Sequence, residues 1–267
     1  MTDERRVTSG APFTSGGVQA LRSALERGSA APRAVRAIIL DAGGVILHPD
    51  LDWIGAQVAE LQGQVTRPQL FQAYYRTIHE LDLTPTMSPN GPAFTGLEIR
   101  VWFFQRLLHH AGVQPTDAMG TQLAQRAMQR FPRESDIYHW AMPDTRQRLQ
   151  RLCDAGFLLG SASNNDDALE AQLEHVGVRD LFRSLKDSGR EGVAKPDPEL
   201  LLRAARELGA SPEHCVFVGD VDRVDGQAAR AAGMAFALLD PLDQPRPTRP
   251  LCIPTLDALL DHFAPMA

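Results

Sequence analysis

Four apolar runs limit the folds available to this chain of 267 residues. They cover Val35–Asp41, Phe157–Ser163, His214–Gly219 and Ala235–Leu239. Their apolar residues are consecutive rather than alternating, which is typical of strands buried on both faces. Such strands occur in parallel sheets with helices on either side. The runs therefore predict a doubly wound, Rossmann-like α/β domain.

The segments between the later runs show helical spacing of apolar residues, and each ends at a glycine. The predicted helices are Asp167–Val176, Pro198–Leu208 and Val224–Ala232, followed by Gly177, Gly209 and Gly233. In parallel sheets of this kind, ligands bind beyond the carboxyl ends of the strands. Asp41, Ser163 and Asp220 stand at these predicted ends, so we expect a site there.

More than 100 residues separate the first run from the second, too many for one crossover connection. Helical patterns occur there at Trp53–Leu61, Leu70–Leu81, Leu97–Ala111 and Thr121–Phe131, and the Pro- and Gly-rich stretch Thr84–Pro92 predicts a loop. We therefore expect a helical cap at residues 49–142, with hinges near His48–Pro49 and Met142–Pro143. Residues 35–48 and 143–267 would form the α/β core, and residues 1–34 a flexible tail.

Composition excludes several classes of partner. The net charge is -6 and both signs are spread along the chain, which argues against a nucleic-acid or anionic-membrane surface. No run approaches the ~18 apolar residues that span a bilayer. Three widely spaced cysteines, Cys153, Cys215 and Cys252, predict reduced thiols, and with no apolar secretion signal we expect a cytoplasmic location.

The residues around the predicted strand ends suit phosphate chemistry. Asp41 is followed by Gly43 and Gly44, whose bare backbone lets N–H groups approach an anion closely. Lys195 is one of only two lysines in the chain, the other being Lys186. Its ammonium can bridge a carboxylate and a phosphoryl oxygen.

Four segments, taken together and in order, resemble the motifs of the haloacid dehalogenase superfamily over about residues 35 to 260. They are Asp41 with its glycines, Ser163-Asn164-Asn165, Ala194-Lys-Pro-Asp-Pro198, and Asp220 with Asp225. The resemblance implies that Asp41 is a nucleophile that forms an aspartyl-phosphate, and that Ser163 and Lys195 act on the phosphoryl group. Gly43, Gly44 and Asn164 would bind substrate, and the amino end of the helix after Asn165 would favour the anion.

The same resemblance implies a Mg²⁺ cofactor. Asp41, Asp220 and the carbonyl of Gly43 would supply oxygen ligands. Asp225 would either join this set or steady Lys195 or a bound water, and Asp222 has no assigned role.

The chain departs from the family pattern at Gly43, where most of its phosphatases carry an acid-base aspartate. General acid-base catalysis is typically worth ~10²- to 10⁴-fold, so turnover could be slow. Candidates to contact the leaving group instead are His48, Tyr74, Tyr75, Arg100 and His109, although a core or surface role is the more common one for such residues.

These features favour a Mg²⁺-dependent phosphatase of a small phosphorylated metabolite, such as a sugar or nucleoside monophosphate. A weakly catalytic module that binds a metabolite or partner is the alternative from another class. A haloacid dehalogenase is less favoured, because the extra carboxylates would repel its anionic substrate. A phosphonatase-like enzyme would need a lysine in the cap, and residues 49–142 contain none. The oligomeric state stays open.

Overall fold

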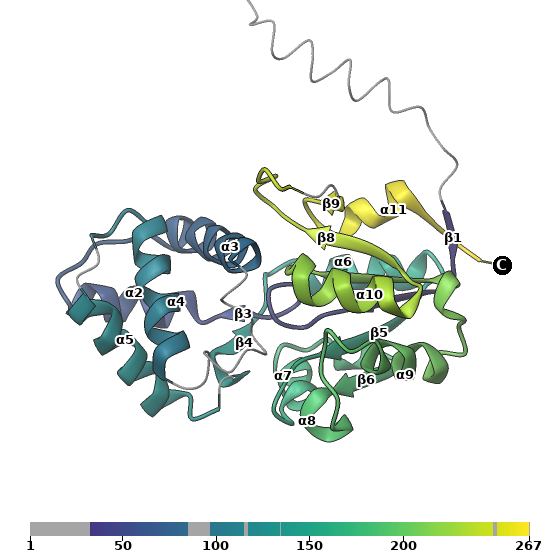
Figure 1. The fold of residues 1–267 in the computed structure, drawn as a ribbon, viewed down its shortest axis with the longest axis horizontal. Coiled ribbons are helices and arrows are strands. Elements are labelled where there is room, and N and C mark those ends of the chain that lie inside the picture. The colour runs from purple at the N-terminus through teal and green to yellow at the C-terminus, as the bar shows by residue number, and fades with distance from the viewer. Residues whose placement is uncertain (1–32, 85–96, 115–116, 134, 248–249, 267) are drawn as a thin grey trace, which may run out of the picture. The chain divides into compact units, whose positions relative to one another are not determined.

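The computed structural model describes residues 33–84, 97–114, 117–133, 135–247 and 250–266 (Figure 1). Residues 33–267 form one compact unit. Strand β1 (Arg33–Val35) pairs in parallel with β10 (Phe263–Pro265), so two residues assigned to the predicted tail belong to a strand. The rest of that tail, and the predicted loop beyond Thr84, lie outside the described residues.

A parallel sheet of six strands forms the core and confirms the predicted fold class. Its order is β6 (Ser184–Asp187), β5 (Leu158–Ser163), β2 (Ala37–Leu40), β7 (Cys215–Gly219), β8 (Ala235–Leu239) and β9 (Leu251–Ile253). All five neighbouring pairs are parallel. The central strand β2 therefore lies between β5 and β7, and their carboxyl ends meet at one edge.

Helices cover both faces of this sheet, because successive residues of a strand point to opposite sides. Ile38 and Leu40 belong to one buried cluster, and Ala37 and Ile39 belong to the other. The first cluster is completed by α6 (Thr145–Asp154), α7 (Leu169–His175) and α11 (Leu259–His262), and the second by α9 (Glu199–Glu207) and α10 (Gln227–Ala232). This two-sided burial explains the consecutive apolar residues of the sequence.

Two predicted helices begin later than the sequence pattern indicates. Asp167 has a φ of 69°, a left-handed conformation, so α7 starts only at Leu169. The segment Asp222–Gly226 is a π-helical turn, η4, and α10 starts after it at Gln227. The remaining short elements are α8 (Ser188–Glu191), η1 (Ser135–Ile137), η2 (Arg179–Leu181), η3 (Pro212–His214) and η5 (Leu256–Ala258).

The described part of the predicted cap contains four helices. They are α2 (Leu51–Glu60), α3 (Arg67–Leu83), α4 (Leu97–His110) and α5 (Asp117–Arg130) (Figure 1). Helix α3 begins with a capping box, in which the side chains and backbones of Thr66 and Gln69 bond reciprocally, and Pro68 stands in its first turn. These helices share a buried apolar cluster that also takes in Val221 and Val224, which follow β7.

The chain enters and leaves the cap through two short strands. β3 (His48–Pro49) and β4 (Tyr138–Trp140) pair antiparallel, with Pro49 opposite Tyr138. The first lies at the predicted hinge and the second a few residues before the predicted Met142–Pro143. Because the two strands are paired, they hold both connections together and bring Tyr138 next to the core.

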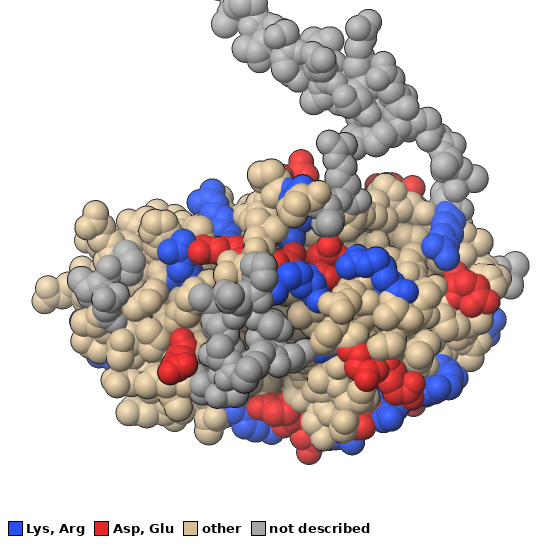
Figure 2. Space-filling model, viewed as in Figure 1, with Lys and Arg blue, Asp and Glu red and all other residues tan. Residues whose placement is uncertain are grey.

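Charged side chains of both signs are interspersed on the face seen in Figure 2. That face shows no extended basic surface among its described residues. None of the described helices has the length and apolar character needed to span a membrane.

A buried ion network ties α3 to the core. Asp82 is 3% exposed, forms an ion pair with Arg246, and accepts a hydrogen bond from the backbone N of Arg223 at 2.9 Å. The Arg223 side chain donates to the carbonyls of Leu81 and Asp82. Arg246 also lies 3.6 Å from the buried carboxylate of Asp240. The end of α3 is thereby joined to the segment that follows Asp220.

We expect Asp82→Ala to lower the free energy of unfolding by about 3–5 kcal/mol, because it leaves a buried guanidinium short of its partner. Asp52→Ala is the matched control. Asp52 lies 3.4 Å from Arg67 in an exposed pair, and its loss should cost about 0–1 kcal/mol. Urea denaturation of both variants tests this, and equal losses would contradict a structural role for the buried network.

Candidate active site

A cavity of about 510 Å³ opens where the carboxyl ends of the central strands meet the cap. Asp41 follows β2, Ser163 ends β5, and Asp220 follows β7, and all three line it. Lys195 and Asp225 line it as well. The structure therefore brings together the residues that the four sequence motifs singled out.

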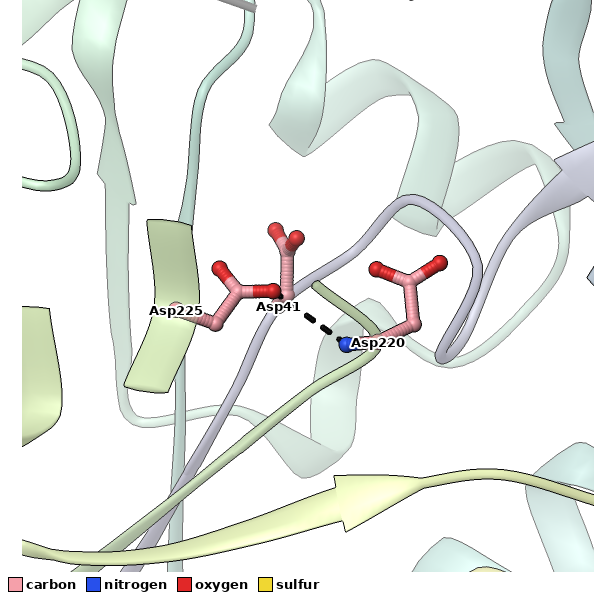
Figure 3. Close-up of side chains that lie close together, drawn as sticks. All are labelled: Asp41, Asp220 and Asp225. Atoms are coloured by element: carbon pink, nitrogen blue, oxygen red, sulfur yellow. Dashed lines mark hydrogen bonds between the residues drawn. The ribbon is translucent and has the colours of Figure 1, made fainter. Parts of the chain in front are cut away.

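Three carboxylates form the floor of this cavity. Asp41, Asp220 and Asp225 each place an oxygen within 4.8 Å of the others, and Figure 3 shows the side chains of Asp41 and Asp220 directed to the same side. Asp220 is 5% exposed and Asp225 1% exposed. Like charges this close and this buried repel one another strongly, so the group needs cations nearby.

Lys195 supplies one positive charge. Its side chain is 1% exposed, and its Nζ lies 2.9 Å from Oδ1 of Asp41 and 2.8 Å from Oδ1 of Asp225. Burial alone would lower the pKa of Lys195, but Asp225 and Asp41 more than offset that effect and raise it. The lysine is thus a permanent ammonium fixed between two carboxylates.

Asp225 is held on both of its oxygens. Oδ1 accepts from Lys195, while Oδ2 accepts from the backbone N of Asp220 at 3.2 Å (Figure 3) and of Val221 at 3.1 Å. A Cβ at Gly219 would lie 2.3 Å from the same oxygen, so this close approach requires glycine. These contacts favour the positioning role that the sequence left open for Asp225, since its oxygens are already engaged.

Asp220 shows that the site has an excess of negative charge. Burial raises the pKa of Asp220 well above its usual range, and the carboxylates of Asp225 and Asp41 raise it further against the opposing effect of Lys195. A divalent cation would remove this penalty. Buried carboxylate oxygens a few ångströms apart are ligands that suit Mg²⁺, so the residues fit such an ion.

Asn164 positions the lysine. Its side-chain Oδ1 accepts from the backbone N of Lys195 at 2.8 Å, and its Nδ2 donates to the Lys195 carbonyl at 2.9 Å. Both ends of the amide are therefore used in holding the Lys195 segment. Asn164 still lines the cavity, but a substrate contact, which the sequence predicted, stays untested.

The helix start that was expected to favour an anion lies later in the chain than the sequence predicted. Helix α7 begins at Leu169, and its first amides are already bonded: the N of Leu169 donates to Asp187 and the N of Ala168 to Asn165. Asp187 ends β6, a strand that the sequence did not reveal. Because side chains take these N–H groups, they are not offered to a ligand.

The two glycines after Asp41 have different roles. Gly44 has a φ of 72°, and a Cβ there would lie 1.7 Å from Oδ2 of Asp220, so only glycine fits. Gly43 is not constrained in this way. A Cβ at Gly43 would meet the ring of Tyr138 at an ordinary 3.7 Å. The absence of a side chain at position 43 is therefore not imposed by the local fold.

A buried hydrogen-bond chain fixes the glycine loop. The hydroxyl of Tyr75 donates to the carbonyl of Gly44 at 3.1 Å, and Nε2 of His48 lies 2.9 Å from that hydroxyl. Because the hydroxyl proton is given to Gly44, Nε2 must be the donor to Tyr75. Burial lowers the pKa of His48 to about 4, which keeps this histidine neutral near pH 7.

Of the other predicted contacts to the leaving group, Tyr74 lies at the cavity, while Arg100 and His109 do not line it. Tyr74 lines it, buried to 1% exposure. Arg100 lines an adjoining recess and donates to the carbonyl of Phe131 at 3.1 Å, while His109 is exposed on α4. Asp222, unassigned from the sequence, forms an ion pair with Arg230 outside the acidic group. Sequence reasoning missed Tyr138, which lies in a short strand with no apolar run to mark it.

The fold and the site together define a class: Rossmann-like α/β proteins with an acidic, lysine-bearing centre at the carboxyl edge of a parallel sheet. A family model described as haloacid dehalogenase-like hydrolase matches residues 35–233. This match spans more than half of the chain, and the chain belongs to that family.

Individual relatives agree with this assignment. The haloacid dehalogenase-like hydrolase domain-containing protein 3 of Mus musculus is 30% identical over 221 residues, 76% of this chain and 83% of that protein. Glyceraldehyde 3-phosphate phosphatase of Methanopyrus kandleri is 31% identical over 132 residues, and the match covers 49% of this chain and only 55% of that protein.

The fold also matches solved structures. The putative HAD-hydrolase YfnB of Bacillus subtilis, described as bound to magnesium, has a TM-score of 0.56 at 20% identity, covering 85% of this chain and 97% of that one. At this identity the likeness concerns the fold alone.

We expect stability to fall between about pH 6.5 and pH 4 because of His48. Its pKa is lowered on folding, so in this window the unfolded chain binds a proton that the folded chain does not, and stability rises with pH. The full effect is about 3 kcal/mol. His48→Phe should flatten the profile from urea denaturation, whereas the exposed His262→Gln should leave it unchanged. A wild-type slope retained in His48→Phe would contradict the assignment.

Proposed function

We propose that this protein is a Mg²⁺-dependent phosphatase that hydrolyses small phosphorylated metabolites through an aspartyl-phosphate on Asp41. The observation that carries the proposal is the convergence of Asp41, Lys195 and the buried Asp220 in one cavity. The family match and the relatives named as phosphatases support the reaction class. Sugar and nucleoside monophosphates are the candidate substrates.

Asp41 is held in an orientation suitable for nucleophilic attack. Its Oδ1 accepts from the backbone N of Ala42 at 2.7 Å and lies 2.9 Å from Nζ of Lys195. Within the described residues no hydrogen bond or ion pair takes Oδ2, so Oδ2 is the oxygen available for attack on phosphorus. The other contacts fix the carboxylate plane, which lowers the entropy cost of an in-line approach.

The charges of the site then act on the phosphoryl group. Phosphoryl transfer depends mainly on positioning and on compensating charge on the equatorial oxygens. Lys195 and the hydroxyl of Ser163, 4% exposed at the end of β5, line the cavity and supply donors. A bound Mg²⁺, held by Asp41, Asp220 and the carbonyl of Gly43, would supply further compensating charge.

Two alternatives have less support. A non-catalytic binding module would not need the nucleophile, the lysine and the acidic pair to converge within hydrogen-bond distances at the cost of a strongly raised Asp220 pKa. A haloacid dehalogenase would bring a carboxylate substrate to a cavity that already holds buried carboxylates. Solved dehalogenases share the fold with this chain, but at under 25% identity that likeness carries no activity.

The first test is p-nitrophenyl phosphate hydrolysis with Mg²⁺ and with excess chelator. We expect release that requires the metal and falls by at least about 10³-fold in Asp41→Asn, which removes the nucleophile. Asp222→Asn is the matched control from outside the acidic group and should keep activity within a few-fold. Equal rates of hydrolysis with and without metal, or an Asp41→Asn variant that still hydrolyses the ester, would contradict the proposal.

The second test asks what the missing acid costs. Gly43→Asp should raise kcat by about 10-fold or more on alkyl phosphates, whose leaving group needs a proton, and much less on p-nitrophenyl phosphate. The fold accepts the change, because the new Cβ meets only the Tyr138 ring at 3.7 Å. Gly43→Asn, similar in size but without an acid, should give no gain; a gain as large as that of Gly43→Asp would show that proton transfer is not the cause.

A further inference from the structure

Aliphatic and aromatic residues form part of the lining of the cavity that holds Asp41. This surface, called here the apolar wall, consists of Tyr74, Ile78 and Leu81 from α3, Tyr138 from β4, and Val221 and Val224 after β7. All six residues also belong to, or pack against, the buried cluster of the cap helices. A leaving group beside this wall therefore meets mostly carbon, together with the hydroxyls of Tyr74 and Tyr138.

The charges that line the cavity have one dominant sign. Four carboxylates and one ammonium are present among the described lining residues, Asp41, Asp166, Asp220, Asp225 and Lys195, for a formal charge of -3. The ammonium is already engaged by two of the carboxylates. When Mg²⁺ and the phosphoryl group are bound, their charges interact with each other and with Asp41, Asp220 and Lys195. The carboxylate of Asp166 also lines the cavity.

A second anionic group on a substrate would thus find no counter-ion in the cavity. Arg100 lines a separate recess of about 160 Å³ that shares Ile78, Leu81 and Tyr138 as its boundary. Its Nη1 already donates to the Phe131 carbonyl. Residues 85–96, outside the described part of the chain, carry no charged residue in their sequence.

We propose that the site selects phosphate monoesters whose leaving group is uncharged and has an apolar face, and that Leu81 is a position that sets this selectivity. The inference rests on the proposed function. Its physical basis is that a carboxylate placed against the apolar wall loses hydration without gaining a counter-ion, and Asp166 in the same cavity repels it. An aromatic or aliphatic face has no such hydration to lose, and burying it against the wall is favourable.

The test compares phenyl phosphate with 4-carboxyphenyl phosphate on the wild-type protein with Mg²⁺. The two esters have the same ring, and the carboxylate makes the phenol a slightly better leaving group. Intrinsic reactivity therefore works against the expected result. We expect kcat/KM to be at least about 10-fold lower for the carboxylated ester, and equal values or a preference for it would overturn the inference.

Two substitutions at Leu81 separate the effect of charge from the effect of lost apolar contact. Leu81→Lys introduces a cation at the apolar wall and should move the ratio of the two kcat/KM values toward the carboxylated ester by about 10-fold. Leu81→Gln is polar but neutral and should leave the ratio near that of the wild type. If both variants shift the ratio equally, loss of apolar contact and not charge determines it, and the inference fails.

Calorimetry distinguishes this inference from the proposed function. Asp41→Asn with Mg²⁺ should bind phenyl phosphate at least about 10-fold more tightly than 4-carboxyphenyl phosphate, without turnover. If wild type hydrolyses neither ester but this binding preference holds, the phosphatase proposal fails and the selectivity stands. If hydrolysis is metal-dependent but the two esters bind and react alike, the selectivity fails and the phosphatase proposal stands.

Discussion

The buried ammonium of Lys195 is the constraint on which the rest of the site depends. A charge that is 1% exposed is tolerable only with partners at hydrogen-bond distance, and here these are Asp41 and Asp225. The three residues come from three separate segments, so the pairing requires the carboxyl ends of β2 and β7 to meet beside the segment that carries Lys195. Asn164 completes the arrangement, because it bonds the lysine backbone from the end of β5. The pairing of the buried Lys195 with its two carboxylates therefore depends on the way the strands of the sheet are arranged.

Much of this arrangement was predictable, and the reasons are physical. Consecutive apolar residues such as Ile38 and Ile39 reveal a strand buried on both sides, and a polar residue at the end of such a strand marks the ligand-binding edge. Strand β6 escaped prediction because an edge strand needs less apolar burial, and its Lys186 is charged. The start of α7 escaped it as well, because the left-handed Asp167 and the bonds of Asp187 to the helix amides depend on tertiary contacts. Tyr138 could not be found, since its partners lie far away in sequence.

Position 43 illustrates the difference between what a fold requires and what a reaction requires. Gly44 is fixed by geometry, because a side chain would collide with Asp220, and its carbonyl is held by Tyr75 and, through it, by the neutral His48. Gly43 next to it has room for a side chain. The loop is thus rigid where it supports the acidic centre and permissive where an acid-base group would stand. Packing therefore does not require the glycine at position 43.

The neighbour that faces this open position is Tyr138, and it connects the acid-base question with selectivity. Its ring lies 3.7 Å from where a Cβ at Gly43 would be, and it also forms part of the apolar wall. Without an acid at position 43, the esters that react fastest should be those that need least protonation, and aromatic leaving groups meet both this demand and the apolar wall. The missing acid and the apolar wall thus favour the same kind of leaving group.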